Sequence, residues 1–248
     1  MSSSVRPVFA ILFFAVSLSA CAGRAPLDAD NDPYENFNRK MFAVEQALDH
    51  YVVEPVAKGY LYVPQPVRRA TRNVLNNLAS PITLVNDALQ GDMRRFGTTF
   101  LRFGINSTVG IVGIFDVARH FGLERHTEDF GQTLAVYGFE AGPYLYVPGL
   151  GPSPPRDLLG WGIDWAFDPV TYISDGDLGV AVGFFALDGI DARAANLGII
   201  DEIERSSVDF YATVRSLYRQ NRKSEIANGV TDLDDLPDID ELDELDDF

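Results

Sequence analysis

Apolar residues in the first third of the chain repeat with the period of an α-helix. Between Tyr34 and Tyr51 they recur at intervals of three and four residues: Tyr34, Phe37, Met41, Val44, Leu48 and Tyr51. This spacing places them on one face of a helix. Asp32 and Pro33 precede the pattern as an expected N-cap and first-turn proline, and Pro55 is expected to interrupt the helix.

The helical period returns several times further along the chain. We expect helices over residues 66–78, 80–90, 92–103, 155–165 and 199–222. Ser80-Pro81 is the expected boundary between the first two of these, because proline is favoured in a first helical turn. The last segment predicts one long amphipathic helix, which Asn228-Gly229 ends. The predicted class is mainly α.

Residues 104–151 differ from the rest of the chain in composition and in the pattern of apolar residues. They contain nine glycines, and their apolar residues follow no long helical period. Within them Tyr144–Val147 lies between Pro143 and Pro148, which indicates a short strand or one arm of an extended hairpin. The expected fold is therefore a single helical domain that carries a glycine-rich apolar hairpin loop.

The first twenty-one residues read as a targeting segment. Arg6 precedes an apolar run from Val8 to Val16 that is too short to span a bilayer. The run leads into Leu18-Ser19-Ala20-Cys21, which resembles the lipobox of bacterial lipoproteins, where the cysteine sulfur is acylated. The alternative is an ordinary secreted protein with a stray cysteine. We expect a signal peptide over residues 1–20, a lipid anchor on Cys21 and a tether over 21–31.

The destination of such a lipoprotein depends on the residue that follows the cysteine. Residue 22 is Ala and not the Asp that retains many lipoproteins in the inner membrane. By resemblance to that sorting rule, we expect a protein anchored to the periplasmic face of the outer membrane. Stable anchoring takes more than one acyl chain, and a fully modified Cys21 would carry about three.

The net charge of −16 is concentrated at the C-terminus. Residues 229–248 hold ten Asp or Glu and no Lys or Arg, so we expect a disordered acidic tail or, alternatively, a tail that binds a partner. A chain this acidic is unsuited to binding nucleic acid through counterion release. The expected helical domain covers residues 32–228.

No catalytic motif stands out. The sequence has no Gly-x-Ser-x-Gly elbow, Walker loop, His-Glu-x-x-His or Gly-x-Gly-x-x-Gly motif. Its three histidines, His50, His120 and His126, lack ligand spacing on a helix. Glu128-Asp129 and Asp157 could form paired carboxylates or serve as surface and helix-cap residues. We therefore expect neither an enzyme nor a bound metal or cofactor.

A basic stretch precedes the glycine-rich region. Residues 55–86 contain no acid, and basic residues continue beyond them. Candidate contacts to anionic lipid headgroups are Arg68, Arg69, Arg72, Arg94 and Arg95. The alternative is that these arginines lie on solvated helix faces and form local salt bridges.

Ten segments in sequence order together resemble one protein family. They are Asp32–Arg39, Pro64–Arg68, Asn76–Pro81, Leu89–Gly91, Arg102–Gly110, Phe115-Asp116, Glu128–Leu134, Gly142–Tyr144, Leu150–Pro152 and Arg156-Asp157. With the lipobox they are similar to the MlaA (VacJ) outer-membrane lipoproteins, from about residue 32 to 228. The acidic tail is not part of the family core.

This resemblance implies a ring-shaped, all-helical, non-enzymatic protein in the periplasmic leaflet of the outer membrane. Family members provide an amphipathic channel through which misplaced phospholipids leave the outer leaflet. They sit beside a trimeric porin and pass the lipid to a soluble periplasmic carrier, which feeds an ATP-driven transporter in the inner membrane. The rival interpretations are a lipid-anchored structural adaptor and a periplasmic lipid hydrolase.

The glycine-rich arm is the candidate gate of this lipid path. Its flexible joints and stiff centre would be Gly138, Gly142, Pro143, Tyr144, Leu145, Pro148 and Gly149. An apolar arm between glycine hinges can swing as a unit. The alternative is a static hairpin that packs on the helices.

Overall fold

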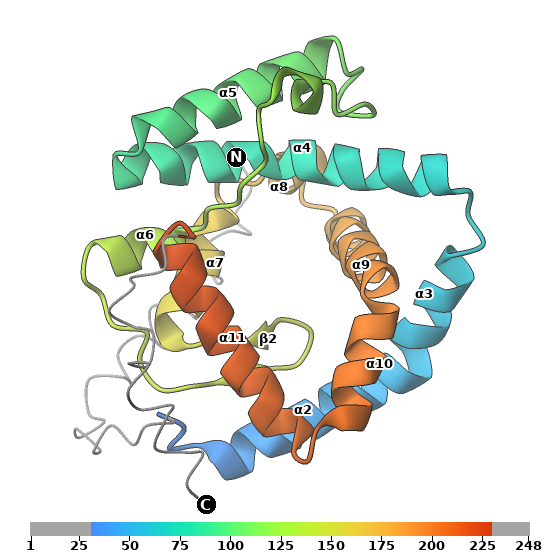
Figure 1. Ribbon diagram of the computed structural model, residues 1–248, viewed down its shortest axis with the longest axis vertical. Coiled ribbons are helices and arrows are strands. Elements are labelled where there is room, and N and C mark those ends of the chain that lie inside the picture. The colour runs from blue at the N-terminus through green and yellow to red at the C-terminus, as the bar shows by residue number, and fades with distance from the viewer. Residues whose placement is uncertain (1–30, 230–248) are drawn as a thin grey trace, which may run out of the picture.

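Helices surround a central space in the computed structural model of the chain, which describes residues 31–229 (Figure 1). In chain order the elements are α2 (Glu35–Leu48), the π-helix η2 (Asp49–Val53), α3 (Glu54–Tyr60), α4 (Gln65–Gln90), α5 (Met93–Thr108), the 3-10 helix η3 (Ala118–Phe121), α6 (Phe130–Val136), β1 (Tyr146–Val147), β2 (Gly151–Pro152), α7 (Pro155–Asp164), α8 (Pro169–Ile173), α9 (Leu178–Ala195), α10 (Leu197–Ser206) and α11 (Phe210–Ile226). The prediction of a mainly α, ring-shaped domain is confirmed.

The ring is closed by contacts between elements distant in sequence. α3 packs on α9, α4 contacts α6, α8 and α9, and α11 packs on α6 and α10. α5 lies along the outer side of α4 (Figure 1). Within the described residues the two strands form one antiparallel pair, in which Tyr146 faces Pro152 and Val147 faces Gly151.

Two prolines do not end helices where the sequence predicts. Pro55 lies in the first turn of α3, directly after the π-helix η2, so the helical path continues through it. There the Glu54 N–H bonds to the Asp49 carbonyl, five residues earlier. This wider turn suits a proline, which has no N–H and would otherwise crowd the preceding turn.

The predicted boundary at Ser80-Pro81 is also wrong. α4 is continuous from Gln65 to Gln90 with Pro81 inside it. A proline removes one backbone hydrogen bond from a helix interior. α4 packs against α5, α6, α8 and α9, and these tertiary contacts hold the helix together across the missing bond.

The single long helix predicted over residues 199–222 is two helices. α10 ends at Ser206, and Ser207 is extended. The Asp209 side chain then caps α11 by accepting the Ala212 N–H. Arg39 on α2 binds the same carboxylate through two nitrogens, at 3.0 and 2.6 Å. A side-chain cap and a distant arginine therefore fix a break that the apolar periodicity conceals.

Asp32 does not cap α2 as predicted. The helix begins at Glu35 without a side-chain cap, and the Asp32 carboxylate reaches across the fold instead. It accepts hydrogen bonds from Asn38 Nδ2 at 2.8 Å, the Tyr211 hydroxyl at 2.5 Å and Arg215 Nη1 at 2.7 Å. This contact ties the start of the described chain to α11.

Side-chain burial is inverted relative to an ordinary soluble domain. The hydrophobic core is a small aromatic cluster of Phe42, Tyr144, Tyr146 and Tyr211. Most other buried side chains are polar, and they include Asn38, Asn77, Asn86, Asp87, Thr99, Arg102, Asn106, Gln132, Thr133 and Asp164. More than half the surface of several large apolar side chains is exposed, among them Phe100, Val109, Ile111, Val112 and Phe115. Exposed apolar surface of this extent marks an interface with a partner or a membrane.

Candidate functional site

The largest hollow that we find in the described part of the chain is a cavity of about 760 Å³ inside the ring. It lies between α2 and η2 on one side and α10 and α11 on the other, with β1 and β2 at its edge (Figure 1). A cavity of this size is in the range of small-molecule binding sites.

One wall of this cavity is apolar. Its side chains come from four elements and are Phe42, Tyr146, Ile200, Ile203, Phe210, Val214 and Leu217. Phe42 meets the Tyr146 and Phe210 rings edge-on at centroid distances of 5.3 and 5.4 Å. These contacts fix the aromatic part of the wall.

Ionisable side chains also line the cavity. They are Glu45, Asp49, His50, Glu54, Arg193 and Glu204. Arg193 Nε and Nη2 donate to the Asp49 carboxylate at 2.8–3.1 Å, and Nη2 also lies 3.5 Å from Asp201. The hydrogen bonds from Arg193 to Asp49 raise the pKa of this guanidinium. The cavity is therefore amphipathic, because apolar and ionisable side chains both line it.

Two smaller hollows adjoin the cavity around Tyr218. One of about 470 Å³ lies beside α11 and the segment 141–144, and the other of about 320 Å³ lies between α7, α11 and residues 149–153. Tyr218 lines all three spaces, and Arg222 lines the two smaller ones.

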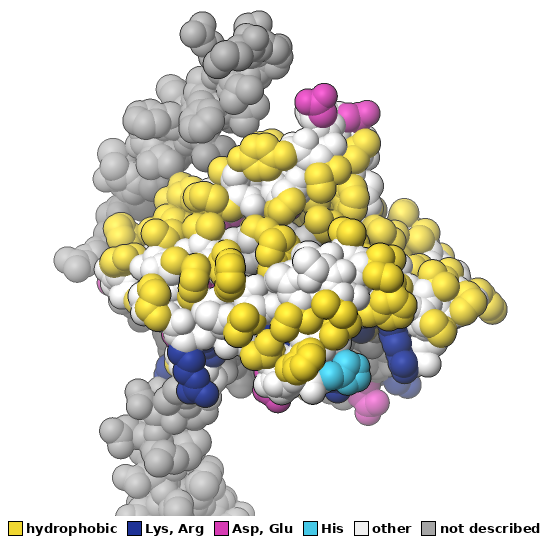
Figure 2. Space-filling view, turned by 90° about the horizontal axis from the view of Figure 1, so that it is seen from above, with side chains coloured by type: hydrophobic (Ala, Val, Ile, Leu, Met, Phe, Trp, Pro, Cys, Tyr) yellow, Lys and Arg dark blue, Asp and Glu magenta, His cyan; other side chains and the backbone are white. Residues whose placement is uncertain are grey.

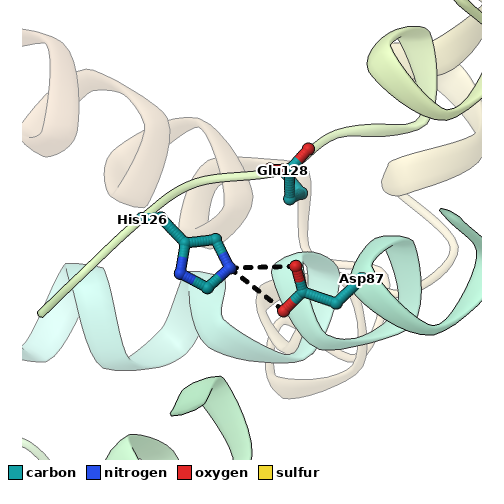
Figure 3. A group of neighbouring side chains, drawn as sticks. All are labelled: Asp87, His126 and Glu128. Atoms are coloured by element: carbon teal, nitrogen blue, oxygen red, sulfur yellow. Dashed lines mark hydrogen bonds and ion pairs between the residues drawn. The ribbon is translucent and has the colours of Figure 1, made fainter. Parts of the chain in front are cut away.

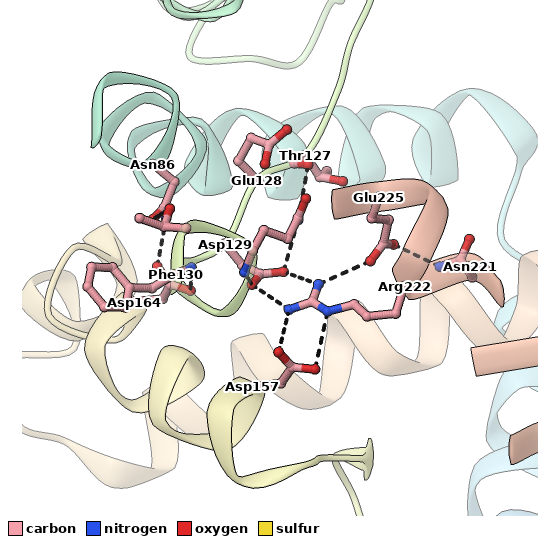
Figure 4. A network of polar contacts seen from close by, with 12 residues as sticks. Asn86, Thr127, Glu128, Asp129, Phe130, Asp157, Asp164, Asn221, Arg222 and Glu225 are labelled. Atoms are coloured by element: carbon pink, nitrogen blue, oxygen red, sulfur yellow. Dashed lines mark hydrogen bonds and ion pairs between the residues drawn. The ribbon is translucent and has the colours of Figure 1, made fainter. Parts of the chain in front are cut away.

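Arg222 on α11 joins α6 and α7 to the C-terminal helix (Figure 4). Its Nη atoms donate to Asp129 at 2.6 and 2.7 Å, and Nη2 and Nε donate to Asp157 at 3.0 and 3.2 Å. Burial raises the pKa of both carboxyls, but Arg222 acts together with hydrogen bonds from Gln132 to Asp129 and from Arg156 and Tyr218 to Asp157, so both pKa values are lowered on balance. Asp129 and Asp157 thus form a structural ion cluster, and Glu128 lies elsewhere.

Glu128 belongs to a second polar cluster between α4 and the segment that follows η3 (Figure 3). His126 Nε2 lies 2.9 and 3.1 Å from the Asp87 carboxylate oxygens, and ligand atoms of Asp87, His126 and Glu128 lie within 4.8 Å of one another. Both Glu128 oxygens already accept hydrogen bonds, one from Arg95 at 2.6 Å and one from Gln90 at 2.9 Å. A divalent cation bound by these three residues would have to share the Glu128 oxygens with the Arg95 and Gln90 donors.

The arginines predicted to contact lipid headgroups have different environments in the structure. Arg72 Nε donates to Asp191 at 2.7 Å and Arg95 pairs with buried Glu128, so these two form structural ion pairs. Arg68 Nε donates to the Val63 carbonyl at 3.0 Å. The remaining two are exposed: Arg69 and Arg94.

The candidate gate is anchored at two positions. Asn38 Nδ2 donates to the Tyr144 carbonyl at 2.9 Å, and Asn38 Oδ1 accepts the Tyr146 N–H at 3.0 Å. Both tyrosine side chains are buried in the aromatic cluster. Gly138, Gly142 and Gly149 have positive φ, and Leu145, Pro143 and Pro148 lie between them.

The outer surface on the α5 side of the ring carries many apolar side chains. In the view onto this side, hydrophobic side chains are spread over the face, whereas Lys, Arg and His lie along one edge (Figure 2). The face includes α5, whose exposed apolar residues are Met93, Phe100 and Leu101. Within residues 31–229, no helix combines the length and apolar character needed to cross a bilayer.

Neither the cavity nor the Arg222 cluster could be located from the sequence alone. Their residues lie on elements far apart in the chain. The motifs Glu128–Leu134, Leu150–Pro152 and Arg156-Asp157 contribute residues to them, but no spacing within one motif joins these parts. The predicted signal peptide, Cys21 and the acidic tail after residue 229 lie outside the described residues.

Comparison with known proteins places these features in a family. The family model described as MlaA lipoprotein matches residues 30–225. The intermembrane phospholipid transport system lipoprotein MlaA of Haemophilus influenzae is 33% identical over 231 residues, covering 90% of this chain and 92% of the relative. The protein of the same name from Escherichia coli is 38% identical over 204 residues, with 80% and 79% coverage. An uncharacterized protein of Rickettsia typhi is 36% identical over 197 residues, with 79% and 78% coverage.

A solved structure has the same fold. It is described as "Structural basis for maintenance of bacterial outer membrane lipid asymmetry" and matches with a TM-score of 0.72 at 36% identity. The match covers 79% of this chain and 98% of that chain. At this identity the likeness extends beyond the fold class to the family.

Proposed function

The chain belongs to the MlaA lipoprotein family, and from this premise we propose that it removes misplaced phospholipids from the outer leaflet of a bacterial outer membrane. A role in lipid transport is the common property of the curated relatives that carry this name. The channel, the hand-off to a periplasmic carrier and the neighbouring trimeric porin are parts of the proposal. We propose no catalytic step.

The amphipathic cavity is the observation that carries this proposal. A phospholipid has apolar tails and a charged headgroup, and a bare headgroup in hydrocarbon is costly. The cavity offers Ile203, Val214 and Leu217 to the tails and charged residues to the headgroup. The paired strands β1 and β2 contribute Tyr146 and Pro152 to its wall.

The inverted burial pattern supports a location in a leaflet. Polar side chains form hydrogen bonds inside the ring, as between Asn86 and Asp164 at 2.8 Å and Thr133 and Asn86 at 2.7 Å. Apolar residues of α5 and the following loop face outward. This arrangement is suited to an apolar environment around part of the ring, and exposed Arg69 and Arg94 are available to lipid phosphates.

Replacement of the predicted acylation site tests the function and the anchor together. In a strain lacking the gene, we expect the wild-type protein to restore low surface phospholipid and resistance to detergent, and Cys21→Ser to leave both at the deletion level. Ser17→Ala is the control, because it changes the signal segment and keeps the cysteine. Cys21→Ser protein that still fractionates with the outer membrane and lowers surface phospholipid would contradict the anchor.

The surface-phospholipid assay and a second assay with purified protein separate the rival functions. If deletion of the gene leaves outer-leaflet phospholipid unchanged, the protein is a structural adaptor and the transport proposal fails. If the purified lipidated protein steadily releases fatty acid from labelled phospholipid, it is a hydrolase. We expect lipid to leave the outer leaflet intact.

The loop after α5 provides a second test, of membrane contact. Ile111 and Val112 have positive φ values of 53° and 56°, which β-branched residues rarely adopt, yet their side chains are 57% and 66% exposed. Hydrogen bonds from Val112 N to Ser107 O and from Gly113 N to Asn106 O hold this conformation. Strained backbone of this kind costs about 1–3 kcal/mol per residue. The strain is consistent with a loop that presents apolar side chains to lipid.

We expect the double variant Ile111→Asn/Val112→Asn to be more stable than wild type and to bind phospholipid vesicles more weakly. Asparagine tolerates the left-handed conformation, so relief of strain should raise the free energy of unfolding by about 1–2 kcal/mol. Ile114→Asn, in the same loop without positive φ, should weaken vesicle binding without raising stability. Thermal unfolding and vesicle flotation measure the two effects. A double variant that is less stable, or that floats normally, would contradict the assignment.

A further inference from the structure

The charged side of the cavity has an excess of acidic groups. Glu45, Asp49, Glu54 and Glu204 line it, against Arg193 as the one residue with a permanent positive charge. Asp49 is paired with Arg193, and Glu54 is paired with Lys58 on the next helical turn. Within residues 31–229, Glu45 and Glu204 form no ion pair with a basic side chain. The Glu45 Oε2 atom accepts only the Gly149 N–H, at 2.6 Å.

Arg193, which lines the same cavity, keeps one donor group unused. The residue is 9% exposed, and its Nε and Nη2 atoms bind Asp49. Its Nη1 atom is buried and has no hydrogen-bond partner among the described residues. A buried guanidinium nitrogen without a partner is costly, and an anionic oxygen is the acceptor that suits it best.

These two observations specify complementary parts of one ligand. The unpaired carboxylates of Glu45 and Glu204 favour a cation, whereas Arg193 Nη1 favours an anion. Ile200 and Ile203 on α10 and Val214 on α11 line the same cavity and supply apolar contacts for the acyl chains. A headgroup with a phosphate and an ammonium can pair with Arg193 and with the glutamates. An anionic headgroup can pair only with Arg193 and is repelled by the excess carboxylates.

We propose that the cavity selects zwitterionic phospholipids of the phosphatidylethanolamine type over anionic phospholipids. The phosphate lies toward Arg193 and the ammonium toward Glu45 and Glu204. This inference rests on the proposed transport function and deepens it by naming the headgroup class. The selection is electrostatic, because identical acyl chains contact the same apolar wall.

The test measures which lipids the protein retains. The full-length lipidated protein is reconstituted in vesicles that contain equal amounts of phosphatidylethanolamine and phosphatidylglycerol with identical acyl chains. It is then extracted in mild detergent, and its bound lipid is quantified by native mass spectrometry. Because an exposed or half-buried ion pair contributes up to about 1 kcal/mol, we expect roughly fivefold enrichment of the ethanolamine lipid.

Matched variants locate the selectivity. Glu45→Gln/Glu204→Gln should abolish the enrichment, so that the two lipids are retained about equally. The amides keep the size of the side chains and remove two negative charges. Glu202→Gln, on the same helix as Glu204 but outside the cavity lining, should retain the wild-type enrichment. If the double variant does not fold, Glu204→Gln alone, at an exposed position, should still lower the enrichment.

The outcomes distinguish this inference from the function on which it rests. Equal retention of both lipids by the wild-type protein, or preference for phosphatidylglycerol, would overturn the headgroup inference and leave transport intact. Unchanged enrichment in Glu45→Gln/Glu204→Gln would also overturn it. Retention of neither lipid would count against the transport function itself.

Discussion

Replacing Arg222 by glutamine is expected to lower the free energy of unfolding by about 3 kcal/mol, because it removes the cation that Asp129 and Asp157 share, while Asp157 keeps its ion pair with Arg156. The Arg222 side chain is 12% exposed and Asp157 is 10% exposed, so water screens this pair poorly. Asp129 is 38% exposed and contributes less. At roughly 2–4 °C per kcal/mol for a chain of 150–250 residues, the melting temperature should fall by about 10 °C.

The dependence on pH gives this prediction a second readout. Burial raises the pKa values of Asp129 and Asp157 in the folded protein, but the combined effect of Arg222 and the other hydrogen-bond donors lowers both. Such carboxylates stabilise the fold above their unfolded pKa, and this contribution is lost as the pH falls below about 4. The free energy of unfolding of Arg222→Gln should therefore decrease less than that of the wild-type protein as the pH is lowered.

Arg69→Gln is the matched control. It makes the same chemical change at an exposed position of α4 and should alter stability by less than about 0.5 kcal/mol. Thermal unfolding followed by circular dichroism between pH 3 and 7, a range chosen to span the carboxyl titration, measures all three proteins. An Arg222→Gln protein as stable as Arg69→Gln would show that the cluster does not hold α11 to α6 and α7.

Alanine at position 160 is expected to be the most damaging small substitution on α7. A Cβ atom there would lie 2.3 Å from Gly131 N and 2.7 Å from Gly131 Cα, so it meets backbone that cannot rotate away. α6 and α7 would have to separate, and the Phe130 N–H bond to Asp164, 2.8 Å long, would be strained. We expect a loss of about 3 kcal/mol or more, at the upper end of overpacking effects.

Gly183→Ala is the control, and it is expected to raise the free energy of unfolding instead of lowering it. This glycine lies inside α9, and a Cβ there has no neighbour within 4 Å. Alanine in an unhindered helix position stabilises by about 0.4–1 kcal/mol, mainly by reducing the freedom of the unfolded chain. Denaturant unfolding of both variants measures the difference. If Gly160→Ala is tolerated as well as Gly183→Ala, the close approach of α6 and α7 is not required.

The amino-acid sequence by itself determined the features that depend on neighbouring residues. Apolar residues at intervals of three and four predict α2 because they share one face of a helix, although most of that face, including Phe37 and Val44, is exposed in the structure. The glycines at 138, 142 and 149 predict backbone freedom on either side of the Tyr144–Val147 arm, and each adopts a positive φ. The lipobox around Cys21 is equally local, since it is read from four adjacent residues. The family resemblance extended these local signals to a ring-shaped fold.

Only the tertiary structure decided the continuity of the helices and the makeup of the cavity. α4 runs through Pro81 because other helices support it, and α11 begins at Phe210 because Arg39 binds the Asp209 cap. Arg222 meets Asp129 across 93 positions, and Asn38 meets Tyr144 across 106. The free energy of such contacts depends on which elements the closed ring brings together, and no spacing within one segment encodes it. The two unpaired glutamates and the unused Arg193 donor share one cavity for the same reason.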